Sequence, residues 1–522
     1  MKKNYPLKNI VVILIIVSLI NINFGCVAYK TTILPKDQPM FADTNKEYFV
    51  YQRNTFRIMK NITIEKDRLI GALIVPPPNF KTKKKQRVNL YLNNTFEIDW
   101  DEYAKTGTTA IPFSAIEKVD VYDMDVGKTI LYTAGGLAGT AGAIFLVILL
   151  LKESCPFVYA YNGESYEFTG EIYSGAIHPP LERHDYLPLP GLSPINNEYK
   201  IKITNEVKEI QHTNLAELIV FDHPENTDIL IDKYGTAHRI VDPRPPHHAT
   251  TIRGDDVESL LINKDDVNYL SGIPEDNDEL MDGVILTFDR PKEAKNGKLL
   301  IRGKNTFWLD YIHGQFSELF GNKLGDWKEK QKTRSFEELM NWSLNQGIPL
   351  SVFLETDKGW EFVDYFNVIG PMAAKEDVLS IDLSKMTSDE VRIKLEFGFL
   401  FWEIDYAAME FTPDFPAQQT RLQVVSAKDQ NGRDVSDLLQ LDDDYYYDQP
   451  YVDDEVLLAF EVPPKKEGIE RTAILHSKGH YEILRNPTGK PDLVYLKGFR
   501  ESGAFPQFSK ERFFQLYNGL QE

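Results

Sequence analysis

The chain has 522 residues, of which 42% are hydrophobic and 26% are charged, a composition typical of folded globular domains. At roughly 150 residues per domain, this length predicts about three domains. The net charge of −20 excludes a dominant role in nucleic-acid binding, which depends on clustered Lys and Arg. With only two Cys, a small disulfide-stapled fold is also excluded.

The charge is distributed unevenly along the chain. Residues 1–128 carry 19 Lys and Arg against 13 Asp and Glu, and residues 129–151 carry no charge. Residues 152–522 carry 39 basic and 65 acidic side chains. A mildly basic N-terminal part and a strongly acidic body are therefore separated by an apolar stretch, which predicts different surroundings for the two parts.

The N-terminus has the pattern of an export signal. Lysines within the first eight residues precede an apolar run from Ile10 to Ile20, which is shorter than the ~20 residues that span a bilayer. Gly25 and Cys26 at its end resemble the lipobox of bacterial lipoproteins, in which the signal is cleaved before the Cys and the Cys is lipidated. Asn23 and Phe24 differ from the Leu and the small residue usual in that family.

This resemblance covers residues 1–26 only. It implies a signal peptide over residues 1–25, lipidation of Cys26 and attachment to a membrane of the bacterial cell envelope. A cleaved ordinary signal and an uncleaved anchor with an incidental Cys are the alternatives. Cys155 would then have no partner, so no structural disulfide is expected.

A second apolar segment, residues 129–151, predicts a transmembrane helix. Its 23 uncharged residues, at 1.5 Å rise each, cover a ~30 Å hydrocarbon core. Gly135, Gly139 and Ala143 recur every four residues, which favours close helix packing and an oligomer formed through the membrane. The alternative is a buried helix of a soluble domain, where each Gly would cost about 1 kcal/mol relative to Ala.

The remaining chain is predicted to be mainly β. Short alternating apolar runs over residues 26–128 indicate a small barrel-like domain. Asn162 and Gly163 mark a β-hairpin, and Ser335 with Glu338 has the capping-box pattern of a helix start.

An internal repeat is the most informative feature of the body. Four apolar segments recur in the same order, with an acidic connection in each copy. The pairs are Lys200–Ile203 with Arg392–Leu395, Leu215–Leu218 with Tyr406–Met409, Val284–Phe288 with Val456–Phe460, and Leu299–Ile301 with Ala473–Leu475. The repeat predicts two β-sandwich modules of jelly-roll-like type, each formed by one copy.

The predicted organisation follows from these patterns. The segments are a signal peptide (1–25), a small β domain (26–128), a transmembrane helix (129–151), a hairpin and ordered loop (152–195), β-sandwich module 1 (196–303), a helical insert (304–347), connecting strands (348–387), β-sandwich module 2 (388–484) and a C-terminal tail (485–522). The segments Cys155–Phe157 and Phe401–Asp405 are loosely similar to uncharacterised exported bacterial proteins, and that resemblance implies no activity.

Metal-capable side chains cluster in one place near the first hairpin. His178, Glu182, His184 and Asp185 lie within eight residues, but Pro179-Pro180 makes the segment a loop and no standard ligand spacing is met. A metal site and a solvated polar loop are the two interpretations.

A second group offers oxygen ligands. Asp429, Asn431 and Asp434 surround a Gly, which suits either a calcium loop or an ordinary turn. No other cofactor is indicated, and the motifs GxSxG, HExxH and CxxC do not occur.

The sequence favours a membrane-anchored envelope lipoprotein with a non-enzymatic binding or scaffolding role. The expected partners are the membrane and an envelope protein or glycan, and nucleic acid is not among them. The alternative is an exported enzyme acting on glycans or another envelope polymer. Carboxylates converging in a pocket would favour the enzyme, and a flat aromatic face would favour binding.

Overall fold

The computed structural model describes residues 29–34, 47–52, 55–64, 68–74, 87–92, 96, 98, 103, 105–124, 156–271, 280–414, 418–465 and 468–519. The signal segment, Cys26 and residues 129–151, with Gly135, Gly139 and Ala143, lie outside them. Within the described part of the chain, no helix is both long and apolar enough to span a bilayer. The chain divides into two compact units, Met1–Ala138 and Gly139–Glu522.

The first unit is one seven-stranded sheet. Its elements are β1 (Tyr29–Leu34), β2 (Glu47–Gln52), β3 (Thr55–Ile64), β4 (Arg68–Ile74), β5 (Arg87–Leu92), β6 (Thr109–Pro112), η1 (Phe113–Ala115) and β7 (Ile116–Met124). The strand order is β1-β7-β5-β2-β3-β4-β6, and only the β2–β5 pair is parallel. Tyr48, Val50, Leu69, Leu90 and Ile111 form its buried core.

The second unit holds most of the strands. Those of its first half are β8 (Phe157–Tyr161), β9 (Tyr166–Glu171), β10 (Arg183–Pro188), β11 (Glu198–Thr204), β12 (Glu209–His223), β13 (Asp228–Ile231), β14 (Ala237–Ile240), β15 (His248–Thr251), β16 (Tyr269–Leu270), β17 (Met281–Asp289) and β18 (Asn296–Asn305). Those of its second half are β19 (Leu350–Thr356), β20 (Gly359–Phe366), β21 (Lys375–Asp382), β22 (Glu390–Gly398), β23 (Trp402–Glu410), β24 (Gln418–Gln423), β25 (Ser426–Asp429), β26 (Tyr447–Gln449), β27 (Glu455–Glu461) and β28 (Glu470–Ile483).

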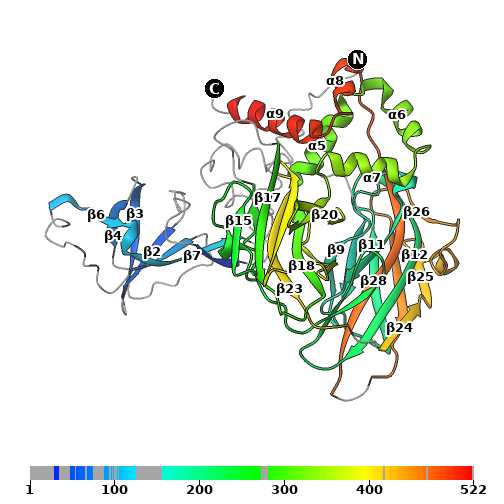
Figure 1. Cartoon of the computed structure of the whole chain (residues 1–522), viewed down its shortest axis with the longest axis horizontal. Helices are drawn as coiled ribbons and strands as arrows, with labels where there is room; N and C mark the ends of the chain where they lie inside the picture. Colours follow the sequence, from blue (N-terminus) through cyan, green and yellow to red (C-terminus); the bar gives the residue numbers. More distant parts are fainter. Residues whose placement is uncertain are drawn as a thin grey trace, which may run out of the picture. The chain divides into compact units, whose positions relative to one another are not determined.

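These strands form two β-sandwiches (Figure 1). The first sandwich has an outer sheet, β25-β27-β11-β8-β9, and an inner sheet, β10-β28-β12-β24, with β26 also pairing β12. The second has an outer sheet, β15-β17-β22-β19-β20, and an inner sheet, β16-β23-β18-β21. The prediction of a mainly β fold is confirmed.

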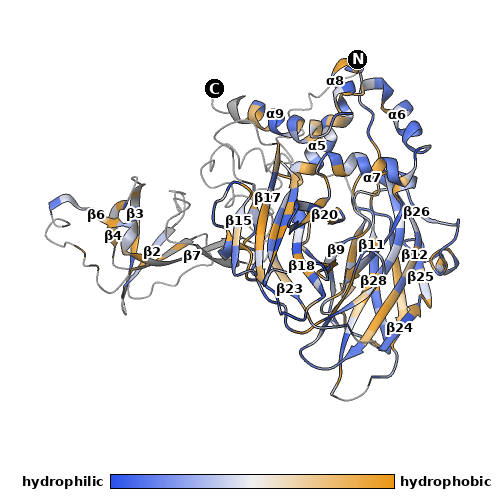
Figure 2. Cartoon of the chain, in the orientation of Figure 1, coloured by the Kyte–Doolittle hydropathy of each residue, from blue (hydrophilic) through white to orange (hydrophobic). Residues whose placement is uncertain are grey.

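Alternating apolar residues form the sandwich cores, because successive side chains of a strand point to opposite faces. In the first sandwich, Ile201 and Leu458 of one sheet and Leu218 and Leu475 of the other belong to one buried cluster. Figure 2 shows apolar and polar residues intermixed along these strands. Each sheet therefore has one face directed to its sandwich core.

The two halves of the second unit are structural copies of one another. Each strand from β8 to β12 has a counterpart from β19 to β23, and each from β15 to β18 has one from β25 to β28, at the same place in its sheet. We call β8–β18 copy 1 and β19–β28 copy 2. Irregularities also recur: a register shift follows Val158 in β8 and Val352 in β19.

A second repeated irregularity fixes the alignment of the two copies. The inner sheets have register shifts beside Thr213 and beside Arg302. At each shift a glycine lies against the backbone of the facing strand. A Cβ added to Gly479 would lie 2.5 Å from His212 O, and a Cβ added to Gly303 would lie 2.8 Å from Glu403 O. Gly303 thus corresponds to Gly479. The structural alignment therefore differs by two residues from the sequence alignment that matched Leu299–Ile301 with Ala473–Leu475.

The copies do not form separate sandwiches, because they exchange halves. The first sandwich combines β8–β12 of copy 1 with β24–β28 of copy 2, and the second combines β15–β18 of copy 1 with β19–β23 of copy 2. The repeat-based expectation that residues 196–303 and 388–484 each form a sandwich is therefore wrong in its grouping. Sequence similarity identifies equivalent strands, but it does not identify which copy supplies a strand's hydrogen-bonding neighbour.

Helices cover one end of the sandwiches (Figure 1). They are α5 (Phe307–Glu318), α6 (Leu324–Gln331), α7 (Phe336–Asn345), α8 (Leu493–Gly498) and α9 (Ala504–Gly519). The unit also has the short turns η2 (Pro179–Leu181), η3 (Glu258–Leu260), η4 (Gly321–Lys323) and η5 (Ser436–Leu438). The capping box of Ser335 and Glu338 is confirmed at the start of α7. Phe316 of α5 contacts aromatic rings of α6, α7 and the C-terminal segment, Trp327, Trp342 and Phe505.

A two-stranded hairpin, β13–β14, is wedged between the sandwiches. Ile229 and Ile231 pack with Phe221 of one inner sheet, and Leu230 packs with Tyr406 of the other. The two inner sheets therefore face the hairpin, and the two outer sheets lie on the far side of their sandwiches.

The exchange predicts that the two copies cannot separate. A specific protease site inserted between Thr333 and Arg334, in the exposed turn after α6, would cut the chain between the copies. We expect the two fragments to co-elute in size-exclusion chromatography and to unfold in one transition, because every sandwich contains strands of both. Separation of the fragments in native buffer would contradict the exchanged arrangement.

Candidate functional site

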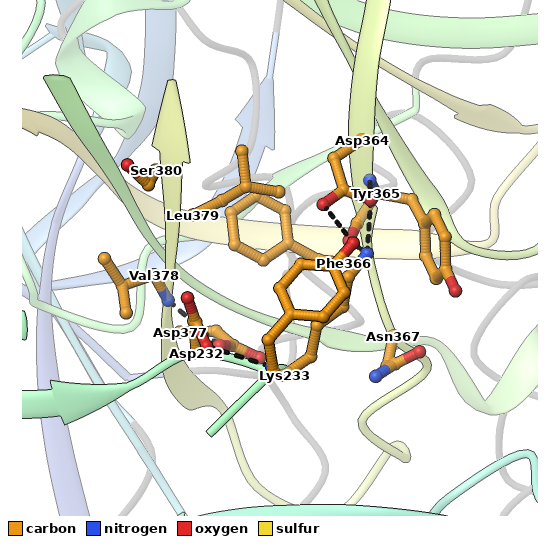
Figure 3. Close-up of a pocket in the computed structure, with 11 residues that line it drawn as sticks. Asp232, Lys233, Asp364, Tyr365, Phe366, Asn367, Asp377, Val378, Leu379 and Ser380 are labelled. Carbon is orange, nitrogen blue, oxygen red and sulfur yellow. Dashed lines mark hydrogen bonds and ion pairs between the residues drawn. The ribbon is translucent and has the colours of Figure 1, made fainter. Parts of the chain in front are cut away.

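One cavity with charged lining residues lies between the hairpin β13–β14 and the second sandwich. The turn after β13, the end of β20 and the middle of β21 surround it (Figure 3). Its volume is about 50 Å³, whereas ligand pockets are typically about 300–1,000 Å³ and one water occupies about 30 Å³ of liquid. The cavity is small on this scale and has room for water.

The ammonium group of Lys233, which lines this cavity, contacts three groups of β20. Its ammonium group pairs with Asp364, donates a 2.7 Å hydrogen bond to Tyr365 O and lies 3.3 Å from the Tyr365 ring centroid. Burial lowers the pKa of Lys233, and the Asp364 carboxylate opposes that shift. These contacts join the hairpin to β20, so we interpret the cavity as a polar seam between the hairpin and the second sandwich.

A second charged group of the hairpin is a histidine between two carboxylates. His238 Nε2 lies 3.0 Å from Asp232 and its Nδ1 lies 2.9 Å from Asp414, which also accepts a 2.9 Å bond from Lys298. Burial lowers the pKa of His238, but the hydrogen bonds to Asp232 and Asp414 outweigh it, so the pKa is raised. His238 is therefore favoured in its charged form.

This arrangement predicts a pH-dependent loss in the His238→Gln variant. Because the folded pKa is raised, the stabilisation by His238 is complete below the unfolded pKa of about 6.5 and is lost as pH rises through the folded pKa. We expect a loss of roughly 1.5–3 kcal/mol at about pH 6 and a smaller loss at about pH 9, measured by thermal unfolding. His247→Gln, at a side chain that is 41% exposed, is the control, and a pH-independent loss would contradict the proposed charge state.

Four charged side chains meet where β10 and β21 approach. Lys375 Nζ is 2.8 Å from Asp185 and 3.8 Å from Asp377. Burial raises the pKa of Asp185, but Lys375 and Arg183 outweigh it and lower the pKa. Arg183 corresponds to Lys375 and Asp185 to Asp377 in strand register, so equivalent residues of the two copies face one another here.

The residues predicted as a metal site do not converge. Asp185 is directed to Lys375, and His178 is buried beside Trp327, 5.6 Å between ring centroids. Burial and, next, Lys328 lower the pKa of His178 to about 4. In the described residues, no group of three or more His, Cys, Asp or Glu is placed to hold a metal ion.

Glu182 and His184 instead join a row of side chains on the first inner sheet. His184 Nδ1 is 2.9 Å from His476 Nε2, and His476 Nδ1 is 2.6 Å from Glu217. Burial raises the pKa of Glu182, but hydrogen bonds from His480, Tyr446 and Lys478 outweigh it and hold the pKa at about 2. A carboxylate with that pKa is ionised at neutral pH and is unsuited to general-acid chemistry.

The residues considered for calcium form a turn. Asp429 Oδ1 accepts hydrogen bonds from the backbone of Asn431 and Arg433 at 2.9 Å, and its other oxygen is 3.0 Å from the Arg433 guanidinium. Asp434 accepts from Ser436. Because the carboxylate oxygens bind loop donors, the structure supports the turn interpretation of these residues.

The outward face of the first outer sheet carries an aromatic cluster, which we call face 1. Phe168 lies 5.5 Å from Tyr159, and Tyr166 lies 5.3 Å from Tyr161, between ring centroids. Lys202 of β11 lies 5.0 Å from the Tyr159 centroid and 5.8 Å from that of Tyr166. Lys202 also pairs with Glu455 at 3.5 Å.

The second outer sheet carries an equivalent cluster, which we call face 2. Phe353 and Phe362 lie 5.6 Å apart. Lys394 lies 4.3 Å from the Phe353 centroid and 5.8 Å from that of Trp360, and it pairs with Glu396 at 2.6 Å. The side chain of Phe362 is the most open member, with half of its surface exposed.

Most members of the two faces correspond; Tyr161 is an exception, since its register position is that of Glu355. Strand register aligns Tyr159 with Phe353, Phe168 with Phe362, Tyr166 with Trp360, Lys202 with Lys394, Lys200 with Arg392 and Glu198 with Glu390. Sheet stability is one reason for aromatic and charged residues at these positions, because cross-strand pairs of these kinds contribute roughly 0.2–1 kcal/mol each. That contribution does not require the same chemistry at the same outward positions in both copies.

The sequence pattern does not single out these side chains. Lys200–Ile203 and Arg392–Leu395 are predicted as repeated strands, and their lysines at alternate positions are the signal that the sequence carries. The aromatic rings come from β8, β9, β19 and β20, where the sequence repeat was not detected. Flat aromatic faces are the feature that the sequence analysis associated with binding rather than catalysis.

No family model and no curated protein matches the chain. A solved chain from the atomic structure of Sulfolobus Turreted Icosahedral Virus is 8% identical, with 64% of this chain and 100% of that chain covered and a TM-score of 0.14. A chain from a structure of the triple jelly roll fold and turret assembly in an archaeal virus is 8% identical, with 58% and 89% covered and a TM-score of 0.12. At these TM-scores the likeness carries no argument about fold or function.

Proposed function

We propose that the chain is a membrane-anchored lipoprotein of the bacterial cell envelope that binds or scaffolds an envelope partner through faces 1 and 2, without catalysis. The repetition of an aromatic, cationic and acidic cluster on two outward sheet faces is the observation that carries this proposal. Exposed aromatic clusters with charged neighbours are typical of recognition surfaces. The alternative is an exported enzyme acting on glycans or another envelope polymer.

The anchor and the finer fold belong to the same proposal. Cys26 carries the lipid, residues 129–151 cross the membrane, and Gly135, Gly139 and Ala143 pack that helix in an oligomer. The N-terminal sheet is barrel-like and the sandwiches are jelly-roll-like. The lipobox-like pattern and the uncharged segment support the two anchors.

The two anchors are separable by mutation. Cys26→Ser should abolish fatty-acid labelling and signal cleavage, yet the protein should remain in carbonate-washed membranes, because a single acyl chain binds only marginally compared with a transmembrane helix. Adding Leu146→Asp and Leu149→Asp should release it, since a charge at mid-bilayer costs about 2.5–3.5 kcal/mol on insertion scales. Unchanged labelling of the Ser variant would refute lipidation, and its full release would refute the transmembrane helix.

Partner contact is tested by photo-crosslinking in intact cells. A photoreactive phenylalanine analogue at position 168 or 362 should crosslink the full-length protein to an envelope component from both faces. The same analogue in place of Tyr445 or Tyr451, whose side chains are 69% and 72% exposed, is the matched control. Crosslinking from the control positions alone, or from none of the four, would contradict binding through these faces.

A further inference from the structure

We propose that faces 1 and 2 are saccharide subsites for an uncharged polysaccharide, and that the chain bridges two strands of that polymer. The inference rests on the proposed function and names the ligand of the same surfaces. It follows from three properties of the faces: the kinds of side chain, their charge balance and the directions in which the faces point.

The side chains match the two kinds of surface on a sugar ring. A pyranose presents C–H groups on its faces and hydroxyl groups, which both donate and accept hydrogen bonds, at its edges. The rings of Tyr166 and Trp360 supply apolar surface for C–H groups. Lys202 with Glu455, and Lys394 with Glu396, place a donor and an acceptor beside those rings.

Charge balance favours an uncharged partner. Each face has basic and acidic groups in contact, as in Lys200 with Glu198 at 3.7 Å and Arg392 with Glu355 at 2.5 Å. A polyanion or polycation would therefore leave one sign of charge on the face unmatched. The body of the chain, with 39 basic against 65 acidic residues over 152–522, additionally repels polyanions.

The faces lie on the outward sides of their sheets and point apart. The hairpin β13–β14 packs on both inner sheets, so the two outer sheets lie on the far sides of the two sandwiches. One polymer strand bound on face 1 is thus directed away from a strand bound on face 2. With two equivalent subsites on opposite sides, the protein can link two polysaccharide molecules. Such linking is the scaffolding role that we propose.

The test measures stoichiometry and bridging separately, with the full-length protein in detergent. The probes are chitin oligosaccharides, dextran and laminarin, with dextran sulfate as the anionic comparison. We expect one of the neutral saccharides to bind at two sites by calorimetry. Tyr166→Ala or Trp360→Ala should each leave one site of unchanged affinity, and the double variant should leave none.

Bridging should respond more sharply than binding. The wild-type protein should aggregate the polymeric form of the bound saccharide, while either single variant, with half as many subsites per particle, should bind the polymer and aggregate it less. Lys202→Met and Lys394→Met, which keep the apolar stem and remove the donor, should weaken the corresponding site without loss of folding. Tyr445→Ala with Tyr451→Ala is the control and should retain two sites and bridging.

Several outcomes would overturn the inference. Preferential binding of dextran sulfate, binding of no neutral saccharide, or loss of sites in the control variant would each do so. If photo-crosslinks form from positions 168 and 362 to a protein while no saccharide binds, the saccharide inference fails and the proposed binding function stands. If neither crosslinks nor saccharide binding occur, both fail.

Discussion

The structure of the second unit depends on hydrogen bonding between strands of different copies. β12 pairs with β28 along most of its length, and β18 pairs with β23; in each pair, one strand comes from each copy. The strands that one copy contributes to a sandwich thus have unpaired edges and only half of the apolar core until the strands of the other copy pair with them. Loop-closure entropy must be overcome before these distant pairings form, which makes them costly to nucleate and strongly cooperative once present.

The exchange also explains where the remaining polar interactions lie. Because equivalent edges β10 and β21 meet, equivalent charges of the two copies are brought together, and Asp185 finds Lys375 rather than a metal ion. Burial makes such charges costly unless they are paired. The wedge hairpin adds its own buried charges, Lys233 and His238, each paired with a carboxylate of the second sandwich or of the segment after its strand β23. The Asp185–Lys375 pair links the two sandwiches directly, and the hairpin pairs attach the hairpin to the second one.

The two copies resemble one another both at inward positions, which the sandwich core requires to be apolar, and at outward positions, which it does not. Inward positions such as Ile201 and Ile393 are apolar in both copies because any sandwich core requires it. Outward positions are free of that requirement, yet Lys202 and Lys394 sit over aromatic rings in the same way. The faces are therefore the part of the repeat that the fold alone does not explain, and this is why they carry the functional proposal.

The amino-acid sequence by itself determined the mainly β fold, the start of α7 at Ser335 and the equivalence of the repeated strands, because these follow from local periodicity, capping chemistry and matching segments. It could place Lys202 and Lys394 in equivalent strands, but not beside aromatic rings. Only the tertiary structure decided that the copies exchange halves, that Glu182 and His184 meet His480 and His476 of a distant strand, and that the aromatic rings of β8, β9, β19 and β20 assemble into two faces. The reason is physical: periodicity reports which face of a strand is buried, whereas strand pairing is chosen by long-range hydrogen bonding and core packing, which no local pattern contains.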